Sequence, residues 1–206
     1  MKKIIHQQHN FPAHVPIMVL PNAALFPNSL LPLYIFEERY QEMLSYCLER
    51  ERMFCIAQMK PGVSEAEDES EFFHVAGLGL IRACVGNQNG TSHLMLQGLA
   101  RVKLINFIQD EPFRIAQIHE LQSSPGKSVE AEALSAKVLE LCREAKEVTS
   151  ELQELVNKQF SHTHDPELVS DFVAQAFVGD PVRKQEILEE LSVCERLRML
   201  IATLQA

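Results

Sequence analysis

The segment that most resembles a catalytic motif is Gly126-Lys127-Ser128, because a phosphate-binding P-loop ends in Gly-Lys-Ser/Thr. A complete P-loop also needs a glycine five residues before Gly126, so that successive backbone N–H groups surround the phosphates. Leu121 occupies that position, and Pro125 removes one N–H donor. We therefore expect a turn at this segment and no nucleotide site.

Metal-ligating residue types are present, but their spacing argues against a metal site. His162-Thr163-His164-Asp165 is dense in ligand types, yet no second cluster in the sequence completes a coordination shell. The acidic stretch from Gly62 to Glu71 lacks the Asp-x-Asp-x-Asp-Gly order of a calcium loop. The cysteines are odd in number and show no Cys-x-x-Cys spacing, which argues against a disulfide framework or a zinc site: Cys47, Cys55, Cys84, Cys142 and Cys194. We expect buried thiols, solvated loops, and neither a metal nor another cofactor.

Catalysis by a nucleophile also has no local signature, because no Gly-x-Ser-x-Gly elbow is present. A site assembled from distant residues stays open as an alternative. The formal net charge of -9, from 19 basic and 28 acidic side chains, disfavours binding to phosphate backbones. Apolar runs such as Pro16 to Leu20 are too short to span a bilayer, and no signal peptide follows the charged N-terminus. We predict a cytoplasmic protein that is not an enzyme and binds neither nucleic acid nor a membrane.

The first half of the chain has the pattern of a β-rich unit with one helix. Apolar runs predict strands, whereas a 3.6-residue period with a charged opposite face predicts one amphipathic helix. Asn89-Gly90 is a strong hairpin signal, because both residues tolerate positive φ. The expected strands cover residues 14–20, 29–36, 53–59, 73–85, 93–97, 101–108 and 113–121, and the helix covers Glu37 to Arg52.

The second half is helical in pattern and follows a linker of turn-forming residues, 122–128. One long helix is expected from Val129 to Phe160, because apolar residues there step alternately by four and three. Asp165-Pro166 and Asp180-Pro181 each predict a helix start, and Ser192 with Glu195 predicts a capping box. We expect these helices to pack against one another, with dimerisation through the long helix as the alternative.

Several stretches, in their order along the chain, resemble the N-terminal substrate-recognition domain of Lon proteases. They are Val15-Pro16-Ile17-Met18-Val19-Leu20-Pro21, Leu25-Phe26-Pro27, Leu31-Pro32-Leu33-Tyr34-Ile35-Phe36-Glu37-Glu38-Arg39-Tyr40, Val75-Ala76-Gly77-Leu78-Gly79, Leu96-Gln97-Gly98-Leu99-Ala100-Arg101-Val102 and Gln185-Glu186-Ile187-Leu188-Glu189-Glu190-Leu191 with Glu195-Arg196-Leu197. The resemblance covers nearly the whole chain and looks closest to the stand-alone members of that family.

The resemblance implies an α+β fold. It consists of a PUA-like β pseudo-barrel with one inserted helix, residues 1–122, followed by a C-terminal α-helical bundle, residues 123–206. It also implies a non-catalytic module that recognises protein substrates. Because the sequence ends at Ala206, the ATPase and Ser-Lys protease domains of a full-length Lon are expected to be absent.

The residues expected to contact a protein partner lie near the start of the chain: Leu25, Phe26, Pro27, Leu31, Leu33, Tyr34, Phe36 and Tyr40. Some of them must be core, and the exposed remainder would form an apolar patch that captures unfolded chains. Gly77, Gly79 and Gly98 are expected at bulges or barrel corners, and Arg101 is expected to hydrogen-bond backbone carbonyls.

The expected partners are unfolded or specific protein substrates, with a protease or chaperone system as a further partner. The expected state is a monomer or a weak homodimer. Two alternatives stay open. One is a small-molecule sensor or enzyme with an unrecognised pocket, and the other is an RNA-binding PUA-like protein, which rests on fold analogy alone.

Overall fold

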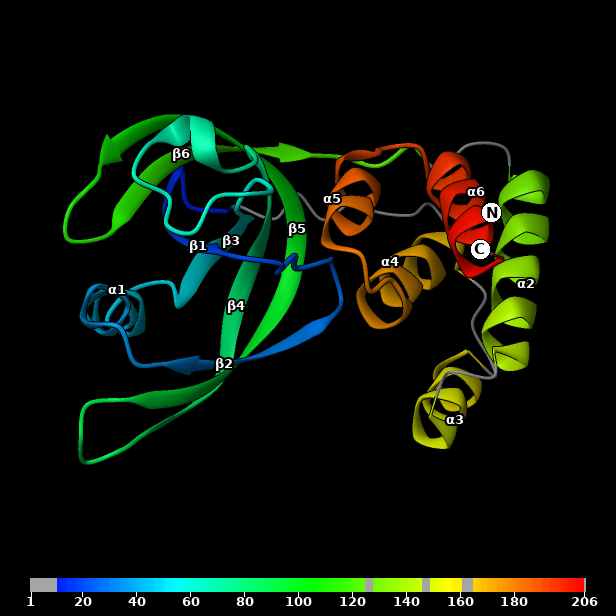
Figure 1. Cartoon of the computed structure of the whole chain (residues 1–206), viewed down its shortest axis with the longest axis horizontal. Coiled ribbons are helices and arrows are strands. Elements are labelled where there is room, and N and C mark those ends of the chain that lie inside the picture. The colour runs from blue at the N-terminus through cyan, green and yellow to red at the C-terminus, as the bar shows by residue number, and fades with distance from the viewer. Residues whose placement is uncertain (1–10, 125–127, 146–148, 161–164, 206) are drawn as a thin grey trace.

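The computed structural model describes residues 11–124, 128–145, 149–160 and 165–205. A six-stranded sheet lies at one end of the molecule, and helices α2 to α6 gather at the other (Figure 1). Helix α1 (Glu38–Leu48) packs against the sheet on the side away from the other helices. The structure is therefore a mixed α and β fold, and the PUA-like label stays an expectation.

The sheet closes on itself through a ring of five strands. The ring pairs β1 with β3, β3 with β4, β4 with β5, β5 with β6, and β6 with β1. Strand β2 pairs with β5 alone and extends the sheet beside the ring. The strands are β1 (His14–Leu20), β2 (Leu30–Ile35), β3 (Met53–Gln58), β4 (Val75–Gly86), β5 (Ser92–Gln109) and β6 (Arg114–Leu121).

The strand predictions are confirmed to within a few residues, with one exception. Strand β1 has the predicted bounds, and Gly90 has a positive φ of 84° in the turn between β4 and β5. The exception is the pair of separate strands predicted at 93–97 and 101–108, which is wrong because β5 runs without a break from Ser92 to Gln109. Register shifts occur within the β4–β5 and β5–β6 pairs. Such irregularities bend a strand, and β5 pairs with β2, β4 and β6 along its length.

Helix α1 is confirmed as amphipathic, although it is shorter than predicted. Tyr40, Met43, Leu44 and Cys47 form its buried face. The helix ends at Leu48, and Arg52 then takes a left-handed φ of 59° where the chain turns into β3. Periodicity continued past the helix end because the turn residues happen to be charged, like the exposed face of the helix.

The single long helix predicted from Val129 to Phe160 is wrong. Two helices occupy this region, α2 (Ser128–Glu144) and α3 (Ser150–Gln159). The Thr149 side chain accepts a hydrogen bond from the Leu152 N–H and caps α3. The Gln153 side chain donates to the carbonyls of Ala145 and Arg143, which satisfies the end of α2. These side-chain bonds replace the backbone bonds that a continuous helix would have made.

The three later helices begin where the capping residues predict. Their N-caps are Asp165, Asp180 and Ser192, and each side chain accepts from a backbone N–H in the first turn. The helices are α4 (Pro166–Phe177), α5 (Pro181–Glu189) and α6 (Val193–Leu204).

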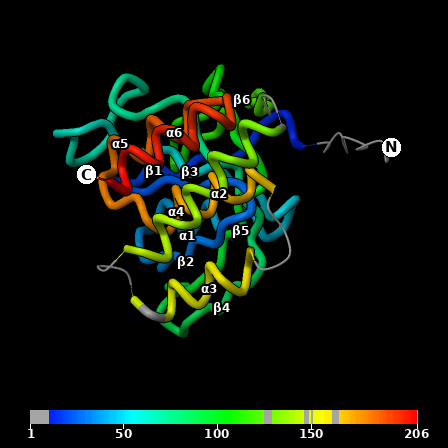
Figure 2. The backbone as a smooth tube through the Cα atoms, turned by 90° about the vertical axis from the view of Figure 1, so that its right-hand side faces the viewer, coloured from blue at the N-terminus to red at the C-terminus, as the bar shows by residue number. Residues whose placement is uncertain are grey.

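Helix α2 packs on α4 and α6, so the apolar residues of α2 are buried against helices of the same chain. Figure 2 shows these helices in front of the strands. Within the described ranges, each helix falls short of the length and apolarity that a bilayer span requires.

Three clusters of buried side chains form the core. One lies between the sheet and α1, and a second lies inside the strand ring. The third lies among the helices, and it includes Ala24 and Phe26 from the loop between β1 and β2. The helical core is therefore completed by a segment that comes from the other half of the sequence.

Candidate functional site

The structure separates the eight residues expected to contact a partner into a buried set and an exposed set. Leu25, Phe26, Pro27 and Tyr40 are buried, so they cannot contribute to a surface in this structure. Leu31 and Leu33 are half-buried, whereas Tyr34 and Phe36 are exposed. The expected patch therefore shrinks to the part of the segment that forms strand β2 and its end.

Leu25 and Phe26 are buried because the loop between β1 and β2 lies directly on the sheet. A Cβ atom at Gly77 would come within 2.0 Å of the Leu25 carbonyl oxygen, and one at Gly98 would come within 2.0 Å of the Phe26 carbonyl oxygen. Only glycine permits this approach. The bulge predicted for these glycines is confirmed at Gly79 and Gly98, which pair at a register shift between β4 and β5. In addition, Gly77 and Gly98 leave room for the loop.

The exposed residues of β2, together with Phe36 directly after it, form an apolar strip. Leu30 is 57% exposed, Tyr34 48% and Phe36 60%. The Tyr34 ring stacks on Phe36 with centroids 5.8 Å apart, and it lies 4.7 Å from the His93 ring. Leu30 was not among the predicted contact residues, although it belongs to the same alternating pattern as Tyr34. Period-two alternation would have found it.

The strip continues across neighbouring strands as a surface that we call the outer face. Residues directly opposite one another in paired strands share a face of the sheet. The register therefore places in one surface Leu30, Pro32 and Tyr34 of β2, His93, Met95 and Gln97 of β5, and Leu80, Ala83 and Val85 of β4. None of these nine paired positions is Asp, Glu, Lys or Arg, in a chain in which 23% of residues are charged. One exposed cation, Arg82, lies in β4 at the register shift between Ile81 and Ala83. A shallow hollow of about 410 Å³ lies on this surface beside Tyr34.

Sequence reasoning missed the contributions of β4 and β5 to the outer face. Alternation marks which residues of a strand share a side, but it does not say which strands are neighbours. The β4–β5 hairpin signal pointed to one of the two pairings. The pairing of β2 with β5 joins segments about 60 residues apart, and no local signal announces it.

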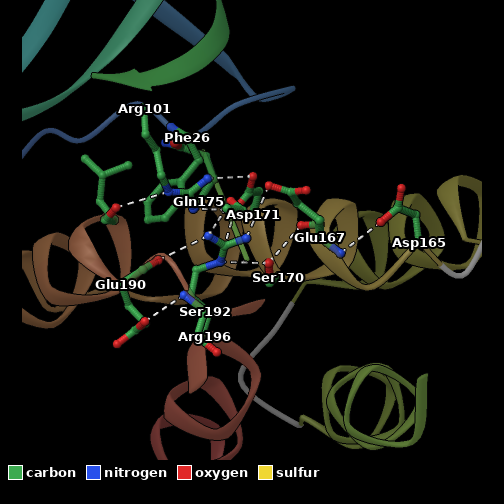
Figure 3. Close-up of polar contacts among 12 residues, drawn as sticks. Phe26, Arg101, Asp165, Glu167, Ser170, Asp171, Gln175, Glu190, Ser192 and Arg196 are labelled. Atoms are coloured by element: carbon green, nitrogen blue, oxygen red, sulfur yellow. Dashed lines mark hydrogen bonds and ion pairs between the residues drawn. The ribbon is translucent and has the colours of Figure 1, made fainter. Parts of the chain in front are cut away.

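Arg101 has a buried structural role, as expected, and its partners include a carboxylate. The Arg101 guanidinium makes a bidentate ion pair with Asp171 of α4 at 3.0 and 2.5 Å, and its Nε donates to the Leu188 carbonyl at 3.1 Å (Figure 3). Arg196 Nε lies 3.8 Å from the same carboxylate. All three side chains are almost fully buried. Burial, followed by the nearby charge of Arg101, lowers the pKa of Arg196.

This buried ion cluster joins the sheet to the helices, so it serves the fold and does not form an open site. Arg101 belongs to β5, whereas Asp171 and Arg196 belong to α4 and α6. Arg196 is further held by the hydroxyls of Ser170 and Ser123 and by the Glu190 carbonyl. Every functional nitrogen thus has a protein partner close by, as buried charges require.

A cavity of about 460 Å³ between β1, α1 and the β5–β6 connection is the place to test the small-molecule alternative. Arg39 is engaged, whereas Arg114 is engaged through Nη2 and its buried Nε has no hydrogen-bond partner among the described residues. Arg39 pairs with Glu37 at 2.8 Å, and Arg114 donates to the Ala66 and Glu67 carbonyls. The Tyr40 hydroxyl bonds to the backbone of Val19, and burial raises its pKa. Most of these polar groups stabilise the walls. Arg114 Nε, 3.9 Å from the Asp110 carboxylate, is an unbonded donor among the lining residues, so the small-molecule alternative stays open.

Nucleophile and metal chemistry find little support among the described residues. Burial raises the pKa of the Cys47 and Cys142 thiols from an ordinary 9.0 to about 12, and it also raises that of Cys55. Such thiols are not reactive thiolates near neutral pH. In the described part of the chain, no three His, Cys, Asp or Glu side chains gather closely enough to hold a metal ion. His162 and His164 lie outside the described residues.

Comparison with known proteins assigns the family. The family model for the substrate-binding domain of ATP-dependent protease La (LON) matches residues 14–206. The chain belongs to this family. The expected resemblance is therefore confirmed, and it extends over nearly all of the described residues of this Lon-family domain.

Relatives and solved structures agree with the assignment. Lon protease of Dictyoglomus thermophilum is 24% identical over 194 residues, which cover 94% of this chain and 24% of that protein. Lon protease 2 of Sorangium cellulosum is 30% identical, with 91% and 24% covered. The Lon domain here thus spans about a quarter of the length of these proteases.

Two solved structures share the fold. The N-terminal domain of the Mycobacterium avium complex Lon protease superposes with a TM-score of 0.71 at 20% identity, covering 93% of this chain and 98% of that one. The Lon N-terminal domain protein from Xanthomonas campestris gives 0.62 at 17% identity, covering 92% and 97%. At these identities the similarity establishes the fold alone.

Proposed function

We propose that this Lon-family domain binds segments of other proteins through the outer face of β2, β5 and β4, and that it performs no catalysis itself. The observation that carries the proposal is a largely apolar surface whose nine paired positions contain no Asp, Glu, Lys or Arg, on a protein whose formal net charge is -9. Contiguous exposed apolar patches on a soluble domain commonly mark interaction sites. Family membership supports the same function, because the matched model describes a substrate-binding domain.

The chemistry of the outer face favours a protein partner over a phosphate-bearing one. Tyr34, Phe36 and Met95 offer large adaptable contacts, and aromatic residues and Met are enriched at protein interfaces. Phosphate binding would call for several Lys or Arg side chains, whereas the nine paired positions contain neither and the β4 bulge adds only Arg82. We therefore favour protein binding over RNA binding, and the experiment below tests for both.

A titration with a matched control tests the proposal. A fluorescent, reduced and alkylated protein that stays unfolded is titrated with this domain at low and moderate salt, and anisotropy is measured. The double variant Tyr34→Ser with Phe36→Ser should weaken binding about tenfold or more, because it removes two aromatic anchors. The control is Ile105→Ser with Ile108→Ser, which removes side chains of similar exposure, 45% and 58%, from the β5–β6 hairpin.

Each outcome has a distinct meaning. Salt-tolerant binding that the Tyr34 and Phe36 substitutions weaken, and that the control leaves unchanged, supports the proposal. Equal loss in both variants would mean non-specific apolar contact and would contradict the assigned surface. Salt-sensitive binding of a single-stranded RNA, with no binding of the unfolded protein, would overturn the proposal in favour of RNA recognition.

A further inference from the structure

We propose that the bound segment adds to the sheet as a seventh strand along the free edge of β2, and that this segment is extended, apolar and uncharged. This inference rests on the proposed function and specifies how the same surface would recognise its partner. In strand addition, main-chain hydrogen bonds supply affinity and alternate side chains supply selectivity. The proposal therefore needs an open edge with outward backbone groups, and a surface beside it that accepts side chains.

Strand β2 has the open edge. Among the described strands, each member of the ring has a neighbour on both sides, whereas β2 pairs along its whole length with β5 alone. Natural proteins usually protect such an edge with charges, especially Lys. Residues 30–35 are Leu-Leu-Pro-Leu-Tyr-Ile and contain no charged side chain. Proline is a second device that protects sheet edges, and Pro32 supplies it here, so this edge is protected by one proline and by no charge.

The backbone of β2 points the required groups outward. The Gly98 N–H of β5 donates to the Ser29 carbonyl at 2.9 Å, so the Ser29 carbonyl faces β5. In antiparallel pairs the residues that bond across the ladder alternate. Leu31, Leu33 and Ile35 therefore bond to β5, and the backbone groups of Leu30, Pro32 and Tyr34 face away from it.

Pro32 limits this edge without closing it. Proline has no N–H, and in a sheet it is tolerated where the missing donor would face the free side. The outward edge therefore offers the N–H groups of Leu30 and Tyr34 and the carbonyls of Leu30, Pro32 and Tyr34. The next carbonyl, that of Phe36, already accepts from the Gln41 side chain at 2.8 Å. A strand added along this edge would therefore lack one hydrogen bond, the one that an N–H at position 32 would have donated.

The chemistry of the surroundings selects the occupant. Alternate side chains of an added strand would lie beside Leu30, Pro32 and Tyr34, none of which can supply a counter-charge. A charged residue there would lose hydration without gaining a partner, which is costly. An uncharged segment with apolar residues at alternate positions does not incur this cost of desolvating a charge.

A single segment fits better than a second copy of this chain. A six-residue strand is about 20 Å long, and a strip about 10 to 20 Å wide along it covers roughly 200–400 Å². A stable interface between two proteins needs about 800 Å² on each partner. The strip therefore suits one extended segment, which contributes main-chain bonds in addition to area.

Whether one substitution strengthens or weakens peptide binding tests strand addition. The probe is a fluorescein-labelled ten-residue peptide of alternating Val and Ser, and affinity is measured by anisotropy. Pro32→Ala restores the missing outward N–H, so binding should tighten about two- to tenfold, as expected for one added net hydrogen bond. Packing of side chains alone predicts the opposite, because the substitution removes apolar surface. The control is Pro61→Ala, at an exposed proline after β3, which should leave affinity unchanged.

Two further measurements test strand addition without relying on the Pro32→Ala variant. Amide hydrogen exchange at Leu30 and Tyr34 should slow when the peptide binds. N-methylation of alternate peptide amides should abolish binding in only one of the two alternating sets. Unchanged or weaker binding by Pro32→Ala, with equal effects of the two methylated sets, would overturn strand addition even if Tyr34 and Phe36 are needed.

The outcomes also separate this inference from the proposed function. If the wild-type chain binds no unfolded protein and no peptide, the proposed function fails, and this inference fails with it. If Pro32→Ala makes the protein dimerise in sedimentation equilibrium and lowers peptide binding, the edge pairs with a second copy, which overturns the assigned occupant.

Discussion

The buried ion cluster is the feature in which single residues matter most. One carboxylate, Asp171, lies between the guanidinium groups of Arg101 and Arg196, and all three side chains are almost fully buried. Asp171→Asn would leave two buried cations without their shared countercharge. We predict a loss of about 3–5 kcal/mol in the free energy of unfolding, the range found when one partner of a buried ion pair is removed.

Urea denaturation of Asp171→Asn and wild type measures this effect. The matched control is Glu140→Gln, which breaks the ion pair between Glu140 and Lys137 on the surface of α2. That change should leave the free energy of unfolding almost unchanged, because exposed pairs contribute little. A similar small loss in both variants would show that the buried cluster does not hold the fold together.

Buried thiols give the stability a dependence on alkaline pH. The pKa of Cys47 and of Cys142 is about 12 in the folded protein and 9.0 without burial. Above pH 9 the unfolded chain loses these thiol protons while the folded chain keeps them. The folded state then binds more protons, so the free energy of unfolding falls as pH rises.

We predict that this contribution to stability is complete below pH 9 and is lost progressively as pH rises from about 9 toward 12. Urea denaturation in the presence of a reductant at successive pH values measures the slope. Cys47→Ala and Cys142→Ala remove one titrating thiol each, so each variant should have a shallower slope than wild type. A slope identical to that of wild type in both variants would rule out the thiols as its cause.

At the scale of elements, the loop between β1 and β2 depends on the glycines beneath it. Because a Cβ at Gly98 would lie 2.0 Å from the Phe26 carbonyl oxygen, the loop would have to lift from the sheet. Phe26 would then lose its place in the helical core, and its N–H would lose the bond to the Gln175 side chain. We predict that Gly98→Ala lowers the free energy of unfolding by about 3 kcal/mol or more, at the upper end of overpacking effects.

Thermal unfolding of Gly98→Ala measures this loss. Gly179→Ala is the control, because a Cβ there meets no atom within 4 Å and the backbone φ is not in the left-handed region. The control should be neutral within about 0.5 kcal/mol. An equally neutral Gly98→Ala would mean that the loop can move away at no cost.

The elements also show how far the sequence could predict the structure. Strand β1 and the three capped helices were found because their signals are local, such as Asp180-Pro181. The break between α2 and α3 was missed because apolar steps of four and three continue through it, while Thr149 and Gln153 make the side-chain bonds that stabilise it. The candidate site was found in part, since the Tyr34 strip is local, but its extension to Met95 depends on strand pairing.

At the scale of the whole molecule, polar contacts join the two halves that the sequence distinguishes. Besides the ion pair of Arg101, the Gln58 side chain donates to the Pro181 carbonyl at 2.9 Å, and the Gln185 side chain donates to the Val75 carbonyl at 3.0 Å. Phe26 completes the helical core from the sheet side. The division at residues 122 and 123 stays a prediction about sequence, whereas the contacts argue for one cooperative unit.

We therefore predict that sheet and helices unfold in one transition. The chain offers a natural pair of probes, because it has no Trp and its three tyrosines, Tyr34, Tyr40 and Tyr46, all lie in β2 or α1. Tyrosine fluorescence thus reports on the sheet half. Far-ultraviolet circular dichroism is dominated by helices, most of whose residues belong to α2 to α6. In urea the two signals should change with the same midpoint and slope, which is the mark of two-state unfolding. Two separated midpoints would contradict the prediction. In Asp171→Asn the midpoints should stay together and shift to lower urea, because weakening a contact between coupled halves destabilises both.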